Sequence, residues 1–392
     1  MLAAAPPADQ ASGVAIAPPR ETHRVANTLL ALPRMMVLLL LEGPRYAAHE
    51  VDAYLESRSP NAFGRDVAKP SWRFGATFEW QTALGASLGV RVGHELGDDT
   101  SVDAYVGLFG PRGQSGGLSA NLGRYTVARL EPTLSFDAGR DLTRAFAGIG
   151  THGPRGTYDQ RGYTAAAGVA GHVGAVRFGA RGSYDDTHAA DPSSDFAYDP
   201  LMLFGFREDT RAATGEVSVT LDTRRSAYRH IVRSAPSSGS YVRGAVAYTS
   251  GKASRSGDFT TARGTLEARQ LFDLFAGNRV LSFGAGIEAI SAEANEVPFD
   301  RLPMLGGRDH LRAFAMGELR DRNAAYADVQ YDWPVGNSMR SYIFAEVGHT
   351  AAWHGAYGGG LRYHTRSSII ARIQIAGSDE GELGMFFQLG AL

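Results

Sequence analysis

WRFGATFEW, residues 72–80, carries an apolar side chain at every second position: Trp72, Phe74, Ala76, Phe78 and Trp80. The positions between them hold Arg73, Gly75, Thr77 and Glu79. Successive side chains of a β-strand point to opposite faces of the sheet, so this alternation predicts a strand with one apolar and one polar face.

The same period of two continues to the end of the chain. It recurs in the ranges 84–92, 176–184, 217–222, 281–288, 325–333 and 369–375. None of these apolar faces carries a charge, many of their positions hold only Ala or Gly, and the opposite faces mix Gly and Ser with Arg and Glu. A soluble sandwich would pack bulky residues on its apolar face. Lipid outside and a wet, charged lumen inside explain the pattern better, so we predict an all-β membrane barrel.

The number of strands follows from the length of the alternating region. Residues 71–392 contain 16 or 17 candidate strands, and the range 129–150 reads either as two short strands or as one long strand. An even count returns both ends of the barrel to the periplasmic side. We therefore predict a 16-stranded antiparallel transmembrane β-barrel, with interfacial aromatic residues near strand ends at Trp72, Trp80, Tyr184 and Trp333. Two connections, Asp185–Asp209 and Ser291–Arg322, are longer than about 15 residues, which predicts either a function or disorder for each of them.

Composition excludes several other classes. The net charge of −2 gives no general attraction to nucleic acid. Cysteine is absent, which rules out disulfides and thiolate metal sites. The longest apolar run, Met35–Leu41, is far shorter than the roughly 20 residues of a membrane-spanning helix, so a helical membrane protein is excluded.

The region before the first strand has a different character. Residues 1–20 are rich in Ala and Pro, which predicts a flexible tail, and the first residues resemble the start of a mature exported protein. Residues 21–70 form a helical leader and linker, with helical spacing broken at Pro33 and at Gly43-Pro44. We expect the apolar part of the leader to lie at the membrane interface or to plug the lumen, ahead of a barrel formed by residues 71–392.

An ordered set of short motifs lies between Asp222 and Gly348. The first is Asp222-Thr223-Arg224, which is followed by Pro236 and Gly239. The next are Val297-Pro298-Phe299, Leu305-Gly306-Gly307, Leu311-Arg312-Ala313-Phe314 and Arg320-Asp321-Arg322. The last two are Tyr331-Asp332-Trp333-Pro334 and Phe344-Ala345-Glu346-Val347-Gly348. In this order they resemble the C-terminal barrel of the outer-membrane protein assembly factor and bacterial surface antigen superfamily, which includes BamA and TamA.

The resemblance implies a 16-stranded barrel whose long sixth loop folds into the lumen. It also implies that the arginine of that loop, here Arg312, pairs with an acidic residue of the wall, here Glu346 in place of the usual Asp. The chain departs from the family at Ala313, where the family has glycine. A backbone conformation with a positive φ is costly for alanine, so we expect the tip of the loop to be arranged differently. It ends in Leu392 rather than an aromatic residue, and it reads as a lone barrel without polypeptide-transport-associated (POTRA) domains.

Other chemistry finds little support in the sequence. There is no phosphate-binding loop, no dinucleotide fingerprint and no zinc-protease motif, so we expect no cofactor. His349 and His354 indicate surface imidazoles rather than a metal site, and no Ser/His/acid spacing selects a triad, so we do not expect an enzyme. Lumen arginines alternate with acidic residues, which predicts a balanced internal network rather than an anion filter: Arg177, Arg181, Arg243, Arg263 and Arg269 among Glu216, Glu267 and Glu288.

Three functions remain open at this point. The first is outer-membrane biogenesis, in which a weak seam between the strand at 72–80 and the strand at 384–392 templates a client strand, with Gly384 and Gly390 weakening the pairing. The second is a pore for small solutes, and the third is a surface antigen without transport. The expected location is the bacterial outer membrane. The expected partners are its lipid and lipopolysaccharide, a client protein or a second copy of the chain, and no nucleic acid.

Overall fold

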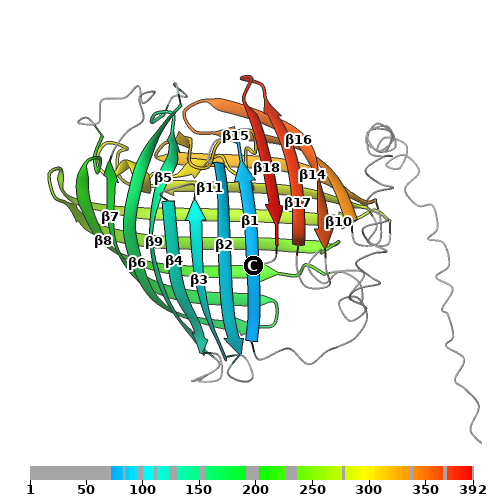
Figure 1. Cartoon of the computed structure of the whole chain (residues 1–392), viewed down its shortest axis with the longest axis horizontal. Coiled ribbons are helices and arrows are strands. Elements are labelled where there is room, and N and C mark those ends of the chain that lie inside the picture. Colours follow the sequence, from blue (N-terminus) through cyan, green and yellow to red (C-terminus); the bar gives the residue numbers. More distant parts are fainter. Residues whose placement is uncertain are drawn as a thin grey trace, which may run out of the picture.

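The computed structural model describes residues 72–82, 85–95, 100–109, 113–122, 130–150, 153, 155–190, 203–225, 236–275, 279–335, 339–364 and 369–390. Sixteen of the described strands close into one antiparallel barrel (Figure 1), which confirms the predicted fold class. The tail predicted for residues 1–20 and the helical leader predicted for 21–70 lie outside the described residues. Within the described part, no helix is long and apolar enough to cross a membrane.

Each strand of the barrel pairs with its neighbours in the chain, and β1 closes the barrel by pairing with β18. The first eight strands are β1 Trp72–Gln81, β2 Gly85–Glu95, β3 Thr100–Phe109, β4 Gly113–Leu122, β5 Leu130–Phe146, β6 Gly156–Val173, β7 Val176–Ala190 and β8 Glu208–Asp222. The other eight are β9 Gly239–Ala253, β10 Gly257–Asp273, β11 Val280–Ile290, β14 Asn323–Pro334, β15 Met339–His349, β16 Trp353–His364, β17 Ile369–Ser378 and β18 Leu383–Leu389. The ambiguous range 129–150 therefore contains one long strand, β5, which ends at Phe146.

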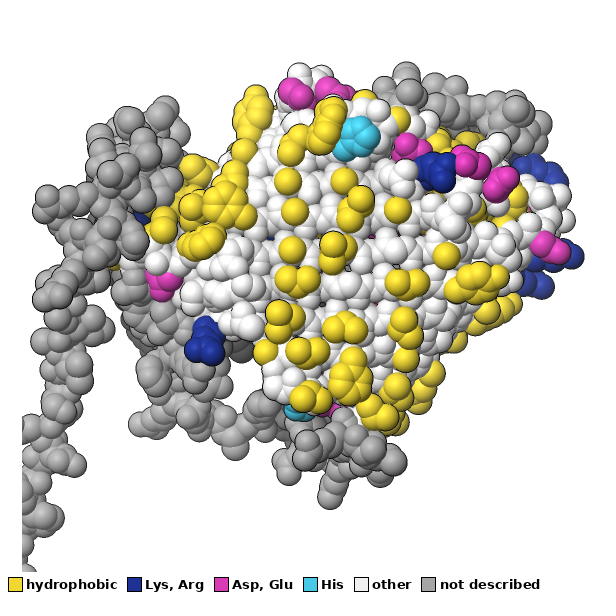
Figure 2. Space-filling model, turned by 180° about the vertical axis from the view of Figure 1, so that it is seen from behind, with side chains coloured by type: hydrophobic (Ala, Val, Ile, Leu, Met, Phe, Trp, Pro, Cys, Tyr) yellow, Lys and Arg dark blue, Asp and Glu magenta, His cyan; other side chains and the backbone are white. Residues whose placement is uncertain are grey.

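The two faces of the wall follow the alternation. Side chains on the apolar face remain exposed on the outside, as at Val219 and Ile373, which are 56% and 47% exposed. Thr77 and Asp328, on the opposite face, are buried in the lumen. Figure 2 shows one outer face, where scattered hydrophobic side chains dot the wall and charged side chains lie mostly toward its rims. Trp333 departs from the prediction, because it stacks on Tyr331 and is buried rather than exposed in an interfacial belt.

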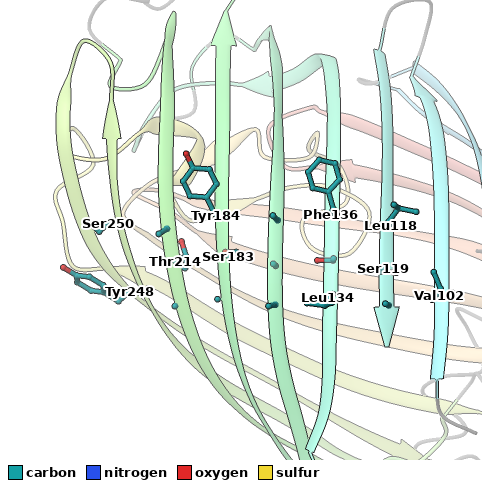
Figure 3. Close-up of a pocket in the computed structure, with 18 residues that line it drawn as sticks. Val102, Leu118, Ser119, Leu134, Phe136, Ser183, Tyr184, Thr214, Tyr248 and Ser250 are labelled. Atoms are coloured by element: carbon teal, nitrogen blue, oxygen red, sulfur yellow. The ribbon is translucent and has the colours of Figure 1, made fainter. Parts of the chain in front are cut away.

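The outer wall is not uniform. Small residues on β6 to β8 leave a shallow apolar hollow of about 940 Å³, which Phe136, Tyr184 and Tyr248 flank (Figure 3). The hollow is part of the face that the alternation assigns to lipid.

The predicted loop Ser291–Arg322 is confirmed in its bounds, because β11 ends at Ile290 and β14 begins at Asn323. It contains the short helix η2 Phe299–Arg301 and a small hairpin of β12 Met304–Leu305 with β13 Leu319–Arg320. We call this segment the lumen loop. The end of the barrel from which it arises is the loop end, and the opposite end, where β14 turns into β15, is the hairpin end.

The other predicted long connection, Asp185–Asp209, is wrong at its start, because β7 continues to Ala190. Asp185 and Asp186 lie within this strand, and each forms an ion pair with an arginine. Asp185 forms an ion pair with Arg301 of the lumen loop, and Asp186 pairs with Arg211 of β8 at 2.9 Å. A strand can carry adjacent acidic residues when each of them has a cationic partner.

The lumen loop provides much of the buried core. Leu305, Leu311 and Phe314 pack with Tyr342 and Phe344 of β15. A second cluster joins Phe299 of the loop to Phe146, Tyr158 and Phe206. Apolar burial of this kind is the main source of stability in a folded chain, so the loop is held inside the barrel by its own side chains.

Candidate functional site: the lumen loop and the seam

Two glycines shape the tip of the lumen loop. Gly306 and Gly307 have φ angles of 100° and 117°, a region that side chains other than glycine rarely adopt. A Cβ atom on Gly306 would lie 2.2 Å from the carbonyl oxygen of Ala315, and the amide of Gly307 donates to the carbonyl of Phe314 at 3.0 Å. The chain therefore turns back on itself here and presents residues 308–314 as a closed tip.

Arg312, at this tip, contacts Glu346 on β15. The amide of Arg312 donates to Oε2 of Glu346 at 2.8 Å, and its Nε lies 2.8 Å from Oε1. Its Nη1 donates to Oε1 of Gln330 at 3.0 Å, and the guanidinium lies 4.0 Å from the centre of the Phe344 ring. The side chains of Arg312 and Glu346 are only 3% and 2% exposed. The structure thus brings the loop arginine and the wall carboxylate together in a buried ion pair.

Burial acts against the charge of Arg312. Desolvation lowers the pKa of its guanidinium, and so do the nearby Arg372 and Arg362, while the carboxylate of Glu346 raises it. A buried ion of this kind depends on its partner, because removal of one member leaves the other uncompensated in a medium of low polarity.

The left-handed residue of the tip is Leu311, with a φ of 49°, and not Ala313. Ala313 does not adopt a positive φ and avoids the cost expected for alanine there, and the tip instead places its left-handed residue at Leu311, in agreement with the expectation of a differently arranged tip. The side chain of Leu311 is fully buried against Gly348 of β15, where a Cβ atom would lie 2.4 Å from its Cδ1. Gly348 is thus required by a close approach, and the wall is recessed to receive the tip.

A second arginine of the motifs, Arg320, holds the base of the loop. It donates to the carbonyl oxygens of Gly317 at 2.7 Å and Phe299 at 3.1 Å, and to the hydroxyl of Tyr158 at 3.1 Å. Asp321 and Arg322 lie nearer the surface, where the amide of Arg322 donates to Oδ1 of Asp321 at 2.8 Å. The motif Arg320-Asp321-Arg322 therefore has one buried member and two peripheral ones.

The motif Asp222-Thr223-Arg224 lies at the hairpin end of β8, away from the loop tip. Arg224 donates to both carboxylate oxygens of Asp222, at 2.9 and 2.7 Å, and stacks 4.5 Å from the ring centre of Tyr241. This is a local bidentate pair that orients the guanidinium at the end of the strand.

The seam between β1 and β18 is short. Four register pairs join the two strands: Phe78 with Leu389, Glu79 with Gln388, Trp80 with Phe387 and Gln81 with Phe386. On its other edge, β1 pairs with β2 along all of Trp72–Gln81. Figure 1 shows β18 ending partway along β1, which continues toward the hairpin end. In the described residues, the backbone of residues 72–77 therefore has no register partner in β18.

The loop tip contacts both strands of the seam. Arg308 lies 3.3 Å from Oε1 of Glu79 on β1. On β18, a Cβ atom at Gly384 would lie 2.2 Å from the carbonyl oxygen of Arg312 and 2.9 Å from Cα of Ala313. Gly384 was expected to weaken strand pairing, and the structure gives it another role, which is to admit the backbone of the loop.

Sequence reasoning missed several of these partners. Glu318 is fully buried and accepts hydrogen bonds from the amide of Ala315 at 2.7 Å and from Arg155 at 3.2 Å. Arg155 also forms an ion pair with Glu382, in the hairpin before β18. Partners more than a hundred positions apart leave no local spacing signal, so they become visible only once the barrel has closed.

The remaining polar candidates act within the wall. Arg243 pairs with Glu216 at 2.9 Å and Arg263 with Glu288 at 2.6 Å, as the balanced network predicts. His354 is buried beside Glu380, which corrects the expectation of a surface imidazole. Among the described residues, no group of three or more His, Asp or Glu side chains is placed to hold a metal ion.

Comparison with known proteins gives the fold its context. No family model and no curated protein matches the sequence. Among solved structures, the chain is similar to BamA from Haemophilus ducreyi lacking POTRA domains 1–3, with a TM-score of 0.60 and 11% identity over 82% of this chain and 70% of that chain. CdiB from Acinetobacter baumannii gives a TM-score of 0.56 and 13% identity over 82% of this chain and 60% of that one. CdiB from Escherichia coli gives a TM-score of 0.54 and 10% identity over 84% of this chain and 66% of that one.

These identities establish a shared fold and nothing finer. The chain has the 16-stranded barrel fold of BamA and CdiB, and it spans less than two thirds of either CdiB chain. This agrees with the fold that the motifs between Asp222 and Gly348 predicted.

Proposed function

We propose that this chain is a bacterial outer-membrane barrel that takes part in membrane biogenesis, by inserting or moving a polypeptide or lipid at the β1–β18 seam. The observation that carries the proposal is the seam itself, where, among the described residues, only Phe78–Gln81 of β1 is in register with β18. An unpaired strand edge presents N–H and C=O groups that a further strand can join by β-augmentation. Among the described residues, the edge of β1 at residues 72–77 is such a template, with Gly390 packed against Ala76 near its end.

Two further observations support this proposal over its alternatives. The lumen loop fills part of the barrel and is anchored on β15 through Glu346, which disfavours a wide aqueous pore for small solutes. The tip also lies against both seam strands, an arrangement that a purely adhesive surface antigen does not need. The outward apolar face and the fold shared with BamA and CdiB support an outer-membrane location.

A seam disulfide tests the proposal. Phe78→Cys with Leu389→Cys joins register partners across the seam, and Thr249→Cys with Thr261→Cys joins partners of β9 and β10 as the matched control. A photocrosslinker at Ala76 should capture a client in cells, the oxidised seam pair should abolish the adduct, and the oxidised control pair should leave it unchanged.

Planar-bilayer recording separates the alternatives. The proposal predicts no steady conductance for the wild-type barrel, and its failure would appear as crosslinking that is insensitive to the seam disulfide. A steady conductance that the seam disulfide leaves unchanged would instead establish a solute pore. The absence of both a crosslink and a conductance would favour a surface antigen without transport.

A further inference from the structure

Between the tip of the lumen loop and the hairpin end lies a cavity of about 460 Å³. Six of the residues that line it are arginines, which come from four strands, the lumen loop and the segment that follows β8: Arg224, Arg269, Arg312, Arg340, Arg362 and Arg372. Three carboxylates line it, those of Glu267, Asp309 and Asp332, so arginines outnumber carboxylates on the cavity wall by three. Burial lowers the pKa of His310, the remaining titratable residue of the lining, so it adds no charge at neutral pH.

Three of the arginines converge on a single ring. The guanidinium carbons of Arg312, Arg362 and Arg372 lie 6.0, 4.0 and 6.0 Å from the ring centre of Tyr342. They come from the loop, β16 and β17, so the fold brings like charges together rather than the local sequence. Asp332 lies 3.4 Å from Arg362 and Asp309 lies 3.8 Å from Arg372, and an anion bound between the three guanidinium groups would offset the repulsion that remains.

Three of the guanidinium groups are oriented by carboxylates that lie outside the cavity. Arg224 pairs with Asp222, Arg269 with Asp328 at 3.1 Å, and Arg312 with Glu346, and none of these three carboxylates lines the cavity. Nearer the cavity, Arg372 donates to Oε1 of Gln374 at 2.7 Å and to the carbonyl of Arg308 at 3.0 Å. The arginines are thus oriented before any ligand arrives, which reduces the entropic cost of binding.

We infer that this cavity binds a phosphate-bearing anion. Planar guanidinium groups match the oxygen geometry of phosphate and bind it with two parallel hydrogen bonds. A phosphate group carries about −1.5 to −2 charges and several acceptor oxygens at neutral pH, so more than one guanidinium group can bind it at once, whereas one carboxylate carries a single charge. The volume suits a small anion or a lipid headgroup, since small-molecule sites measure about 300–1,000 Å³. Asp309 keeps 62% of its side-chain surface exposed, so water and solutes reach the site.

The proposal does not depend on the function proposed for the seam, and inorganic pyrophosphate is a suitable probe. The purified full-length chain in a non-ionic detergent is titrated with pyrophosphate by calorimetry, at low and at high salt. Arg362→Gln, at the centre of the cluster, should weaken binding by about tenfold, because it removes one charge-assisted contact. Arg243→Gln is the matched control, since Arg243 also faces the lumen and pairs with Glu216 but does not line the cavity.

Folding of each variant is checked by its heat-modifiable mobility on semi-native gels, and Arg372→Gln replaces Arg362→Gln if the latter does not fold. Equal affinity in Arg362→Gln and wild type, or no binding by wild type, would overturn the inference. Citrate binding as tightly as pyrophosphate would overturn the preference for phosphate. Detergent micelles that contain phosphatidylglycerol distinguish the two sources: displacement of pyrophosphate identifies a lipid headgroup as a ligand, and no displacement identifies a free phosphate compound.

Discussion

Replacement of Arg312 or Glu346 by alanine removes one member of a buried ion pair and leaves the other without its partner. In Arg312→Ala, Glu346 loses the Nε contact at 2.8 Å, and Gln330 loses its donor at 3.0 Å. The loss of one partner from a buried pair costs about 3–5 kcal/mol. Each single variant should therefore lower the free energy of unfolding by about 3 kcal/mol.

The double variant should lose less than the sum of the two single losses, by about 1–3 kcal/mol, because the pair is broken only once. The measurement is equilibrium unfolding in guanidinium chloride with the barrel in detergent, followed by tryptophan fluorescence. The matched control is the exposed pair Arg322 and Glu293, whose side chains are 37% and 60% exposed. Alanine at either position there should cost less than about 1 kcal/mol. Additive losses at positions 312 and 346 would refute the lock, and the loop would then be held by its apolar contacts alone.

The other predictions concern the wall and the loop tip. Val219→Arg should block assembly in a bilayer, because arginine at the membrane midplane costs about 2–4 kcal/mol, whereas Ser218→Arg, on the lumen face, should assemble. Equal yields of folded barrel for the two variants on semi-native gels would argue against the assignment of the membrane face. Gly384→Ala should lower the melting temperature, since the new Cβ would meet the loop backbone at 2.2 Å, whereas Gly264→Ala meets no atom within 4 Å and should be neutral. Ala313→Gly should destabilise the barrel by about 0.5–1 kcal/mol, because it gains chain entropy without relieving strain, and a stabilised variant would contradict the assigned backbone geometry.

The alternation of the strands and the bounds of the lumen loop could be predicted because both are local. A period of two needs only neighbouring residues, as in Trp72–Trp80, and the loop is marked by the motifs that begin at Val297 and end at Arg322. The contact of Arg312 with Glu346 was predicted from the resemblance to a family. The spacing of the two residues in the sequence would not have predicted it.

What could not be predicted depends on closure of the barrel. Glu79 meets Arg308 across 229 positions, and nothing near either residue specifies the other. The position of the left-handed residue of the tip could not be predicted either. The cost of the positive φ at Leu311 is offset by burial of its side chain on Gly348, and this contact joins the loop to a strand that comes later in the chain. Local propensity favours glycine at such a position, and tertiary packing has overridden it here.

The distribution of contacts over the loop indicates which of them would survive opening of the seam. The strong contacts of the tip, those of Arg312 with Glu346 and Gln330, are made to β15 and β14, which do not border the seam. The charged contact to β1 is weak, since Arg308 is 48% exposed in its pair with Glu79, and such pairs contribute at most about 1 kcal/mol, whereas the tip packs closely on Gly384 of β18. Separation of β1 from β18 therefore costs little in contacts between the loop and β1 and leaves the loop anchored on β15 and β18, so the lumen stays occupied while the unpaired edge of β1 grows from residues 72–77 to residues 72–81.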